Sequence, residues 1–543
     1  MFIYKPSLDA ENIVKNGGEY GKRYLAELDA EYKKLIAAPI PELSAEKFAE
    51  FKRSGSRISY ERDYFLRRTM LRDFALKLWL GDKTAAVHLT NIIDAICSET
   101  TWILPAHEGK GDIRTQIDLF AAETAQTLTE AVALTGGSLD AETKERAIDE
   151  VNTRVLKPFI NRTQKYGWER SVSNWSAVCG GCVGMTVLYL IEDINAAKQL
   201  TEPLKEAFEN YMRSFADDGA CLEGLYYWGY GMTYLTAFLE LYRERMGEEF
   251  PVNYEKIAKM ADFPHKCCIT DGVTVSFSDA GCRDKIYAGL SSRLTKEYGA
   301  TPIADEYLSY FYGDDCGRWC RAARDVAWAE EQREAVLPAR SVLLDAEWVV
   351  VRGDMPFAIK GGNNGEPHNH NDIGSFTVIW DGEPLVIDIG AGEYTKDYFS
   401  DKRYTIFCNR SAGHSVPLID NIEQSVGAEY AAGCFTFEDD TVKMDIAGAY
   451  DSEKLQSLVR QIKPNVKGVN LTDTFILTQK SVIRERFIIR DKNSVKRFKT
   501  IPPLIPEIKT FPHRTHDGKT IEITAADYIF EAAGEFIFSL IIE

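Results

Sequence analysis

The sequence lacks several features that would assign it to a special class. It has no apolar run of about 18 residues, so it predicts no transmembrane helix. Its first residues, Met1 to Pro6, lack a basic stretch followed by an apolar one, and no signal peptide is expected. Its 11 cysteines are scattered, which indicates reduced thiols and a cytoplasmic location. A periplasmic or secreted location stays open if a leader has been removed.

The chain also lacks a surplus of basic residues. It has 64 Lys and Arg against 82 Asp and Glu, and its formal net charge is −18. This balance disfavours broad electrostatic capture of nucleic acid, so neither a nucleic-acid nor a membrane partner is expected. An anionic substrate is still compatible, because a local cluster of Arg, His and Asn can override the overall field.

What the sequence does contain falls into two halves. Through about the first 335 residues, apolar residues recur at helical spacing, as in Phe65–Leu78, or fill a whole segment, as in Trp175–Ile191. These helices follow one another with short connections and no strands between them. The pattern predicts a helical domain over residues 1–335, folded as a toroid or a solenoid.

The pattern changes near Pro338. Short β-rich runs follow, among them Trp348–Val351 and Phe376–Trp380, and turn residues separate them. These runs predict an antiparallel β-sandwich over residues 340–543. Because helices and strands are segregated, the two domains are joined by a linker expected between 325 and 342.

A cluster of histidines and acidic residues lies in the β-rich half. Three of the eight histidines fall between 368 and 414. His368 and His370 are two residues apart, so on a strand both imidazoles would point to one face. Asp388 follows a predicted hairpin turn at Asp381-Gly382 and lies among apolar residues, so its carboxylate needs a partner. Two His and one Asp are a usual ligand set for zinc or another divalent ion, although hydrogen bonds within a turn would also suit these residues.

Three loops of the helical half combine aromatic and polar residues. They are 102–108, 168–176 and 218–231. Aromatic faces stack on sugar rings, and Asn and His bind hydroxyl and carboxylate groups. Trp168 or Trp228 alone is best explained as core packing, but the three loops together predict a carbohydrate-binding cleft.

These motifs together resemble a known family. His368-Asn-His370-Asn-Asp372, Asp388 within Val-Ile-Asp-Ile-Gly390, and His414 within Ala-Gly-His-Ser resemble the β-domain signature of the heparinase II/III-like polysaccharide lyases. Matching toroid motifs are Asn174-Trp175, the stretch from Glu223 to Gly231, and Trp102 to His107 followed by Asp118-Leu119. The resemblance covers roughly residues 100 to 490.

The resemblance implies an α/α toroid joined to an antiparallel β-sandwich, with the active site between them. Members of this family cleave uronic-acid polysaccharides by β-elimination. By resemblance Tyr227 is the base and acid, with Tyr226 and Tyr230 as alternative registers, and Asn174 and His368 neutralise the uronate carboxylate. Because tyrosine has an ordinary pKa of about 10, positive charge must lower that pKa, or the phenol must pass its proton to a histidine.

The resemblance also implies the remaining site residues. His370, Asp388 and His414 match the ligands of one divalent metal ion, zinc or manganese rather than calcium, with a structural role. Residues expected to bind substrate are Trp102, His107, Trp175 and Glu223. The expected substrate is a glycosaminoglycan such as hyaluronan, chondroitin or heparan sulfate, with alginate as the alternative. The oligomeric state stays open, with a homodimer among the options.

Three other functions compete with this interpretation. His-x-His-x-Asp also begins a metal-dependent hydrolase motif, but Ile373 occupies the place of its next histidine. An inverting glycoside hydrolase would use a carboxylate pair such as Glu223 and Asp218. A carbohydrate-binding protein without catalysis would need the aromatic loops alone.

Overall fold

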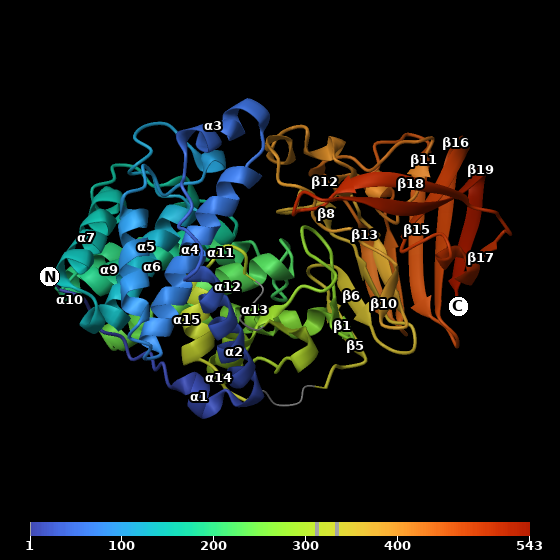
Figure 1. The fold of residues 1–543 in the computed structure, drawn as a ribbon. Helices are drawn as coiled ribbons and strands as arrows, with labels where there is room; N and C mark the ends of the chain where they lie inside the picture. Colours follow the sequence, from blue (N-terminus) through green and yellow to red (C-terminus); the bar gives the residue numbers. More distant parts are fainter. Residues whose placement is uncertain (1, 310–313, 332–335) are drawn as a thin grey trace.

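A computed structural model describes residues 2–309, 314–331 and 336–543. The helices come first and most of the strands follow, so the chain forms a helical domain joined to a β-domain (Figure 1). This order confirms the predicted succession of an α domain and a β domain.

The helical domain is a ring of antiparallel helices around apolar inner helices. Its α-helices are α1 Asn12–Asn16, α2 Gly18–Leu35, α3 Ala45–Ser54, α4 Ile58–Trp79, α5 Ala85–Cys97, α6 Leu119–Thr135, α7 Ala141–Val151, α8 Lys157–Ile160, α9 Asn174–Leu190, α10 Ile194–Thr201, α11 Leu204–Arg213, α12 Leu225–Met246, α13 Tyr254–Cys267, α14 Ala288–Tyr298 and α15 Trp319–Ala327. Helix α9 lies between α6 and α12 and is buried on nearly all sides, as its uniformly apolar sequence predicts.

The prediction that this half contains no strands was wrong. Four short strands follow α13: β1 Cys268–Thr270, β2 Val273–Thr274, β3 Ile286–Tyr287 and β4 Leu308–Ser309. Each is two or three residues long, too short to give a period-2 pattern in the sequence. The connection from β2 to β3 includes Asp279, which lies at the centre of the candidate site.

The β-domain is built on one antiparallel 13-stranded sheet that folds around a shared apolar core. Its strands, with the small β8–β12 pair beside it, are β5 Arg340–Leu343, β6 Trp348–Val351, β7 Phe357–Lys360, β8 Asn363–Asn364, β9 Phe376–Trp380, β10 Glu383–Val386, β11 Leu418–Ile419, β12 Gly427–Ala431, β13 Gly433–Glu438, β14 Thr441–Asp445, β15 Leu455–Pro464, β16 Val469–Ile489, β17 Phe498–Ile501, β18 Glu507–Arg514 and β19 Thr520–Ile542. The longest pairing joins β16 to β19.

The predicted hairpin is confirmed at β9 and β10. Trp380 pairs with Glu383, and the two residues between them, Asp381 and Gly382, both have positive φ, as a two-residue hairpin turn requires. Strand β10 ends at Val386, so Asp388 lies just beyond the strand rather than within it.

The two domains are joined by hydrogen bonds as well as by the chain. The last helix ends at Ala327 and the first β-domain strand begins at Arg340; part of the expected linker, 332–335, lies outside the described residues. Asp218 Oδ2 accepts the backbone N–H of Asp345 at 2.8 Å, and Arg352 Nε donates to the carbonyl of Cys268 at 2.9 Å. Within the described residues, no helix has both the length and the apolar character needed to cross a membrane.

Candidate active site

Tyr227 and His368 bring the two domains together at one point. Tyr227 lies in the first turn of α12, and its ring rests on the His368 imidazole with centroids 4.3 Å apart. The Tyr227 hydroxyl lies 2.5 Å from the hydroxyl of Tyr394, another β-domain residue. Two phenols and an imidazole from opposite domains therefore share one half-buried location.

The other two tyrosines of this segment point elsewhere because the segment is helical, not a loop. Tyr226 and Tyr230 are four residues apart on α12, and the hydroxyl of each contacts a residue of the helical domain rather than of the β-domain. Tyr230 is 3% exposed and donates its hydroxyl to Glu123, so it is a core residue, which counts against a role as base. The Tyr226 hydroxyl faces the Arg318 guanidinium at 3.5 Å.

Glu223 joins the two residues that were expected to neutralise a uronate carboxylate. Its Oε2 accepts the Asn174 side-chain amide at 2.6 Å and lies 3.5 Å from His368 Nε2. Its Oε1 accepts the Asn174 backbone N–H at 3.0 Å. Glu223 is fully buried and contacts both Asn174 and His368, so its burial disfavours the expected direct contact with substrate.

Asp279 is the residue that sequence reasoning missed. It comes from the helical domain, is buried, and its two oxygens bind two histidines of the β-domain: Oδ2 accepts His368 Nδ1–H at 2.6 Å and Oδ1 accepts His370 Nε2–H at 3.1 Å. His368 and His370 thus converge on one carboxylate rather than on one face of a strand. His368 has a positive φ of 56° in an irregular segment, so the predicted strand geometry was wrong.

Two tyrosines that follow Asp388 complete the hydrogen-bond network. Tyr394 donates to Asp279 Oδ2 at 3.0 Å, and Tyr398 donates to Asp279 Oδ1. Arg403 places its guanidinium 3.6 Å from the same carboxylate. The available signal was the aromatic run from Tyr394 to Phe399 shortly after a predicted metal ligand, and sequence reasoning did not use it.

The electrostatics of the site follow from burial and from Asp279. Burial opposes protonation of His368, but the hydrogen bond and charge of Asp279, with the charge of Glu223, leave its pKa raised above the ordinary value. Burial, reinforced by the charge of Asp279, raises the pKa of Tyr227, and the hydrogen bond with Tyr394 acts in the opposite direction. Tyr227 therefore rests as a neutral phenol.

The three predicted metal ligands are clustered and buried. Side-chain ligand atoms of His370, Asp388 and His414 lie within 4.8 Å of one another, and His414 Nδ1 is 3.5 Å from Asp388 Oδ2. The other nitrogen of each histidine is committed: His370 Nε2 binds Asp279, and His414 Nε2 donates to the Cys408 carbonyl at 2.7 Å. In the neutral form of each imidazole, Nδ1 then carries no proton.

The unsatisfied atoms of this cluster match the requirements of a metal ion. His370 Nδ1, His414 Nδ1 and Asp388 Oδ2 are buried and have no hydrogen-bond partner among the described residues, a costly arrangement without a cation. Two imidazole nitrogens and a carboxylate oxygen form a typical set for zinc or a similar ion, with second partners orienting each imidazole. A second carboxylate oxygen, Asp372 Oδ2, lies 4.0 Å from His414 Nδ1.

Three of the residues expected to bind substrate come from the aromatic loops. His107 and Trp175 form a pair, and Trp102 lies in the core. His107 and Trp175 contact each other at 4.8 Å between ring centroids and are partly exposed, and Asp118 Oδ2 accepts from His107 Nδ1 at 2.7 Å. Trp102 is 1% exposed and donates to the Ile96 carbonyl, so its burial disfavours the expected contact with substrate.

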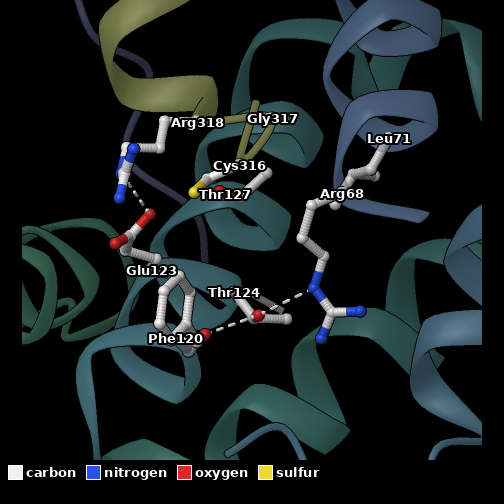
Figure 2. A pocket seen from close by; sticks show the side chains of 9 residues that line it. All are labelled: Arg68, Leu71, Phe120, Glu123, Thr124, Thr127, Cys316, Gly317 and Arg318. Carbon is white, nitrogen blue, oxygen red and sulfur yellow. Dashed lines mark hydrogen bonds and ion pairs between the residues drawn. The ribbon is translucent and has the colours of Figure 1, made fainter. Parts of the chain in front are cut away.

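A small cavity inside the helical domain is lined by the charged side chains of Arg68, Glu123 and Arg318 together with uncharged residues (Figure 2). Arg318 and Glu123 approach each other at 3.6 Å, and Arg68 donates to Thr124 at 3.2 Å. The cavity between them measures about 10 Å³, which is room for about one water molecule. This cavity is too small to hold a sugar ring.

Comparisons with known proteins agree with this architecture. Residues 336–496 match the family model described as heparinase II/III-like, C-terminal. A solved heparinase III, the BT4657 gene product, is 12% identical with a TM-score of 0.61, over 99% of this chain and 93% of that one. Heparan sulfate lyase HepC from Pedobacter heparinus is 12% identical with a TM-score of 0.58, over 95% and 88%. None of the curated proteins matches the sequence. At this identity the structural likeness establishes a fold, a toroid followed by a β-sandwich.

Proposed function

Since residues 336–496 form a heparinase II/III-like C-terminal domain, we propose that this protein is a polysaccharide lyase. Its substrate is a polysaccharide or oligosaccharide that contains uronic acid, with glycosaminoglycans favoured over alginate because the similar solved structures include a heparan sulfate lyase. The reaction is β-elimination, which leaves a 4,5-unsaturated uronate at the new chain end.

The observation that carries this proposal is the meeting of Tyr227, Tyr394 and His368 at the domain junction. A phenol beside an imidazole and a second phenol can transfer a proton. Asn174 is linked to His368 through Glu223, whose Oε2 lies close to both side chains. This set supplies both functions that elimination needs: an acid–base group and donors for a carboxylate.

The elimination moves one proton and breaks one C–O bond. Tyr227, as phenolate, takes the proton from C5, and the electron pair of that C–H bond becomes the C4=C5 double bond. The glycosidic C4–O bond breaks, and the Tyr227 phenol returns the proton to the leaving oxygen. Tyr227 is again a phenolate at the end of the reaction, so one residue serves first as base and then as acid.

Forming the phenolate is the costly part of this sequence, because burial keeps Tyr227 neutral at rest. The Tyr227 hydroxyl meets that of Tyr394, and Tyr394 also donates to Asp279 Oδ2 at 3.0 Å. Asp279 does not take the proton: although burial opposes its ionisation, the hydrogen bonds and charges of His368 and His370 hold its pKa well below the ordinary value. No positive side chain overcomes the effect of burial on Tyr227, so in place of the two routes expected from the sequence we propose that Tyr394, which is partly exposed, takes the Tyr227 proton and releases its own to solvent. Tyr394 then donates a hydrogen bond to the phenolate and stabilises its charge.

The uronate carboxylate would be bound by His368 and Asn174. A protonated His368, favoured by Asp279, offers a positive charge, and the Asn174 amide offers a second hydrogen atom beyond the one given to Glu223. Neutralising the carboxylate makes the adjacent C5 proton more acidic, because the negative charge that develops is shared with these donors.

A divalent ion would be held by His370, Asp388 and His414. When bound, it supplies structural rigidity to the loop that carries His368. Asp279 then connects the two parts of the site, since its carboxylate orients His370 toward the ion and His368 toward the substrate.

The rival hydrolase has less support. An inverting hydrolase needs two accessible carboxylates about 6.5–9.5 Å apart with water between them. Glu223 is fully buried against Asn174, and Asp218 Oδ2 binds the backbone at Asp345 and Ala346. Neither carboxylate is placed to activate water.

The test is to incubate the purified protein with hyaluronan, chondroitin, heparan sulfate and alginate, and to follow ultraviolet absorbance. A lyase yields an absorbing unsaturated uronate, whereas a hydrolase yields new reducing ends without that absorbance. Binding of a polysaccharide without either product would favour a non-catalytic carbohydrate-binding protein.

A further inference from the structure

The β18–β19 hairpin lies outside the residues that match the family model, yet its tip reaches the candidate site (Figure 1). His516, at this tip, places its ring 4.5 Å from the ring of Tyr394, measured between centroids. Tyr394 is the residue whose hydroxyl meets Tyr227. His516 therefore contacts Tyr394, which in turn contacts Tyr227, the proposed acid–base residue.

The tip is a hydrogen-bonded turn. Thr515 N–H donates to the Lys519 carbonyl and Gly518 N–H donates to the Thr515 carbonyl, both at 2.8 Å. Asp517 pairs with Lys519 at 2.6 Å, and Gly518 has a positive φ of 78°, which a glycine adopts without strain. His516 is presented outward by this turn.

The tip is fixed against both walls of the site. On the β-domain side, Glu393 N–H donates to the Arg514 carbonyl at 3.0 Å, directly before Tyr394, and the two side chains form an ion pair. On the helical side, a Cβ added to Gly518 would lie 2.9 Å from Ile58 Cδ1, so the tip contacts the start of α4. The hairpin thus spans the two domains beside Tyr227.

The His516 imidazole is exposed and its nitrogens are uncommitted. Among the described residues, neither nitrogen has a hydrogen-bond partner, and the ring packs against Tyr394 at an interplanar angle of 53°. Charged groups that act on it come from both domains: Asp279, Arg57, Asp517 and Asp315. An aromatic-backed imidazole with free donor and acceptor atoms matches the polar edge of a sugar ring.

We propose that His516 is a substrate-binding residue that hydrogen-bonds a hydroxyl group of the sugar held beside Tyr394. The proposal rests on the proposed lyase function. It assigns a role in the site to the C-terminal hairpin, which would help to hold the polysaccharide where Tyr227 acts.

The test compares three variants on the polysaccharide that the wild-type protein cleaves fastest. His516→Phe keeps a ring against Tyr394 and removes both nitrogens, His516→Ala removes the ring as well, and Glu522→Gln changes an exposed residue of the same hairpin as a control. Loss of one hydrogen bond to substrate should raise KM about 3- to 10-fold in both His516 variants. Changes in kcat below about 3-fold are expected, since the lost contact holds the substrate before and during reaction. The control should keep the wild-type KM.

The possible outcomes separate substrate binding by His516 from a role in packing or stability. If His516→Phe keeps the wild-type KM while His516→Ala does not, ring packing alone explains the residue and the proposal is overturned. If both variants keep the wild-type KM, His516 does not contact substrate. A fall in melting temperature equal in both variants, with KM unchanged, would assign a structural role instead. If the wild-type protein yields no unsaturated product from any polysaccharide, the proposed function fails, and this proposal fails with it.

Discussion

His368 donates its Nδ1–H to Asp279 Oδ2 over 2.6 Å, and this bond joins residues 89 positions apart in different domains. The second Asp279 oxygen binds His370, so a single carboxylate of the helical domain orients both histidines of the β-domain. The proposed catalytic group and the proposed metal cluster are therefore not independent sites. A change at any member of this network should affect the others.

Asp279→Asn should lower turnover about 10- to 100-fold, the range for a partner that orients a metal ligand. Asparagine keeps the shape of the side chain, but it removes the charge that favours protonated His368. Measurements of kcat and of bound metal check this. Asp284→Asn is a matched control in the same loop, where the carboxylate accepts Gly281 N–H and contacts neither histidine. Equal activity in both variants would contradict the proposed role of Asp279.

Tyr227→Phe should reduce kcat by at least about 100-fold, within the range for loss of general acid–base catalysis. The ring that packs on His368 is kept, so KM and melting temperature should change little. Tyr226→Phe should be nearly neutral, because its hydroxyl faces Arg318 on another side of the helix. Full activity of Tyr227→Phe would assign the acid–base role to a different residue.

Tyr230→Phe should lower the stability of the protein rather than its kcat. Its hydroxyl donates to the buried Glu123, and an unpaired buried acceptor costs about 1–3 kcal/mol. We expect a lower melting temperature and a kcat close to the wild-type value at temperatures where the variant is folded. Thermal unfolding followed by circular dichroism, with kinetics at 25 °C, separates these effects. An inactive but stable variant would return Tyr230 to the list of candidate bases.

The pH profile should rise on its acidic side and then level off. Burial raises the pKa of Tyr227, so below that pKa the reactive phenolate is a small fraction that grows about tenfold per pH unit. The carboxylate is bound by protonated His368, whose pKa Asp279 raises against the effect of burial, so above that pKa the loss of the His368 proton offsets the gain in phenolate. We therefore expect kcat/KM to increase with pH up to the pKa of His368 and to change little above it, provided that the protein stays folded. A flat profile below the pKa of His368 would show that forming the phenolate does not limit the reaction.

Removing the metal should destabilise the protein. His370→Ala should lower both metal content and melting temperature, because it removes one of three buried ligands. Treatment of the wild-type protein with a chelator should lower the melting temperature in the same direction. His88→Ala, which changes a partly buried histidine of α5, should leave metal content unchanged. Wild-type protein purified without chelator and free of metal would contradict the assignment.

The sequence by itself determined the two-domain order and much of the candidate site. Apolar residues at helical spacing specified the helices, and Asp381-Gly382 between β-rich runs specified the β9–β10 hairpin, because both are local patterns set by backbone geometry. His370, Asp388 and His414 were predicted as a cluster, and the folded chain brings them together.

Only the tertiary structure decided which residues meet across the domain junction. No local pattern marks Asp279 or Tyr394. The two residues bind each other although they lie 115 positions apart in the sequence and in separate domains. Burial likewise depends on packing: it placed Trp102 in the core, separated Tyr227 from Tyr230, and enclosed Glu223. Long-range contacts and desolvation are properties of the whole fold, so no window of sequence contains them.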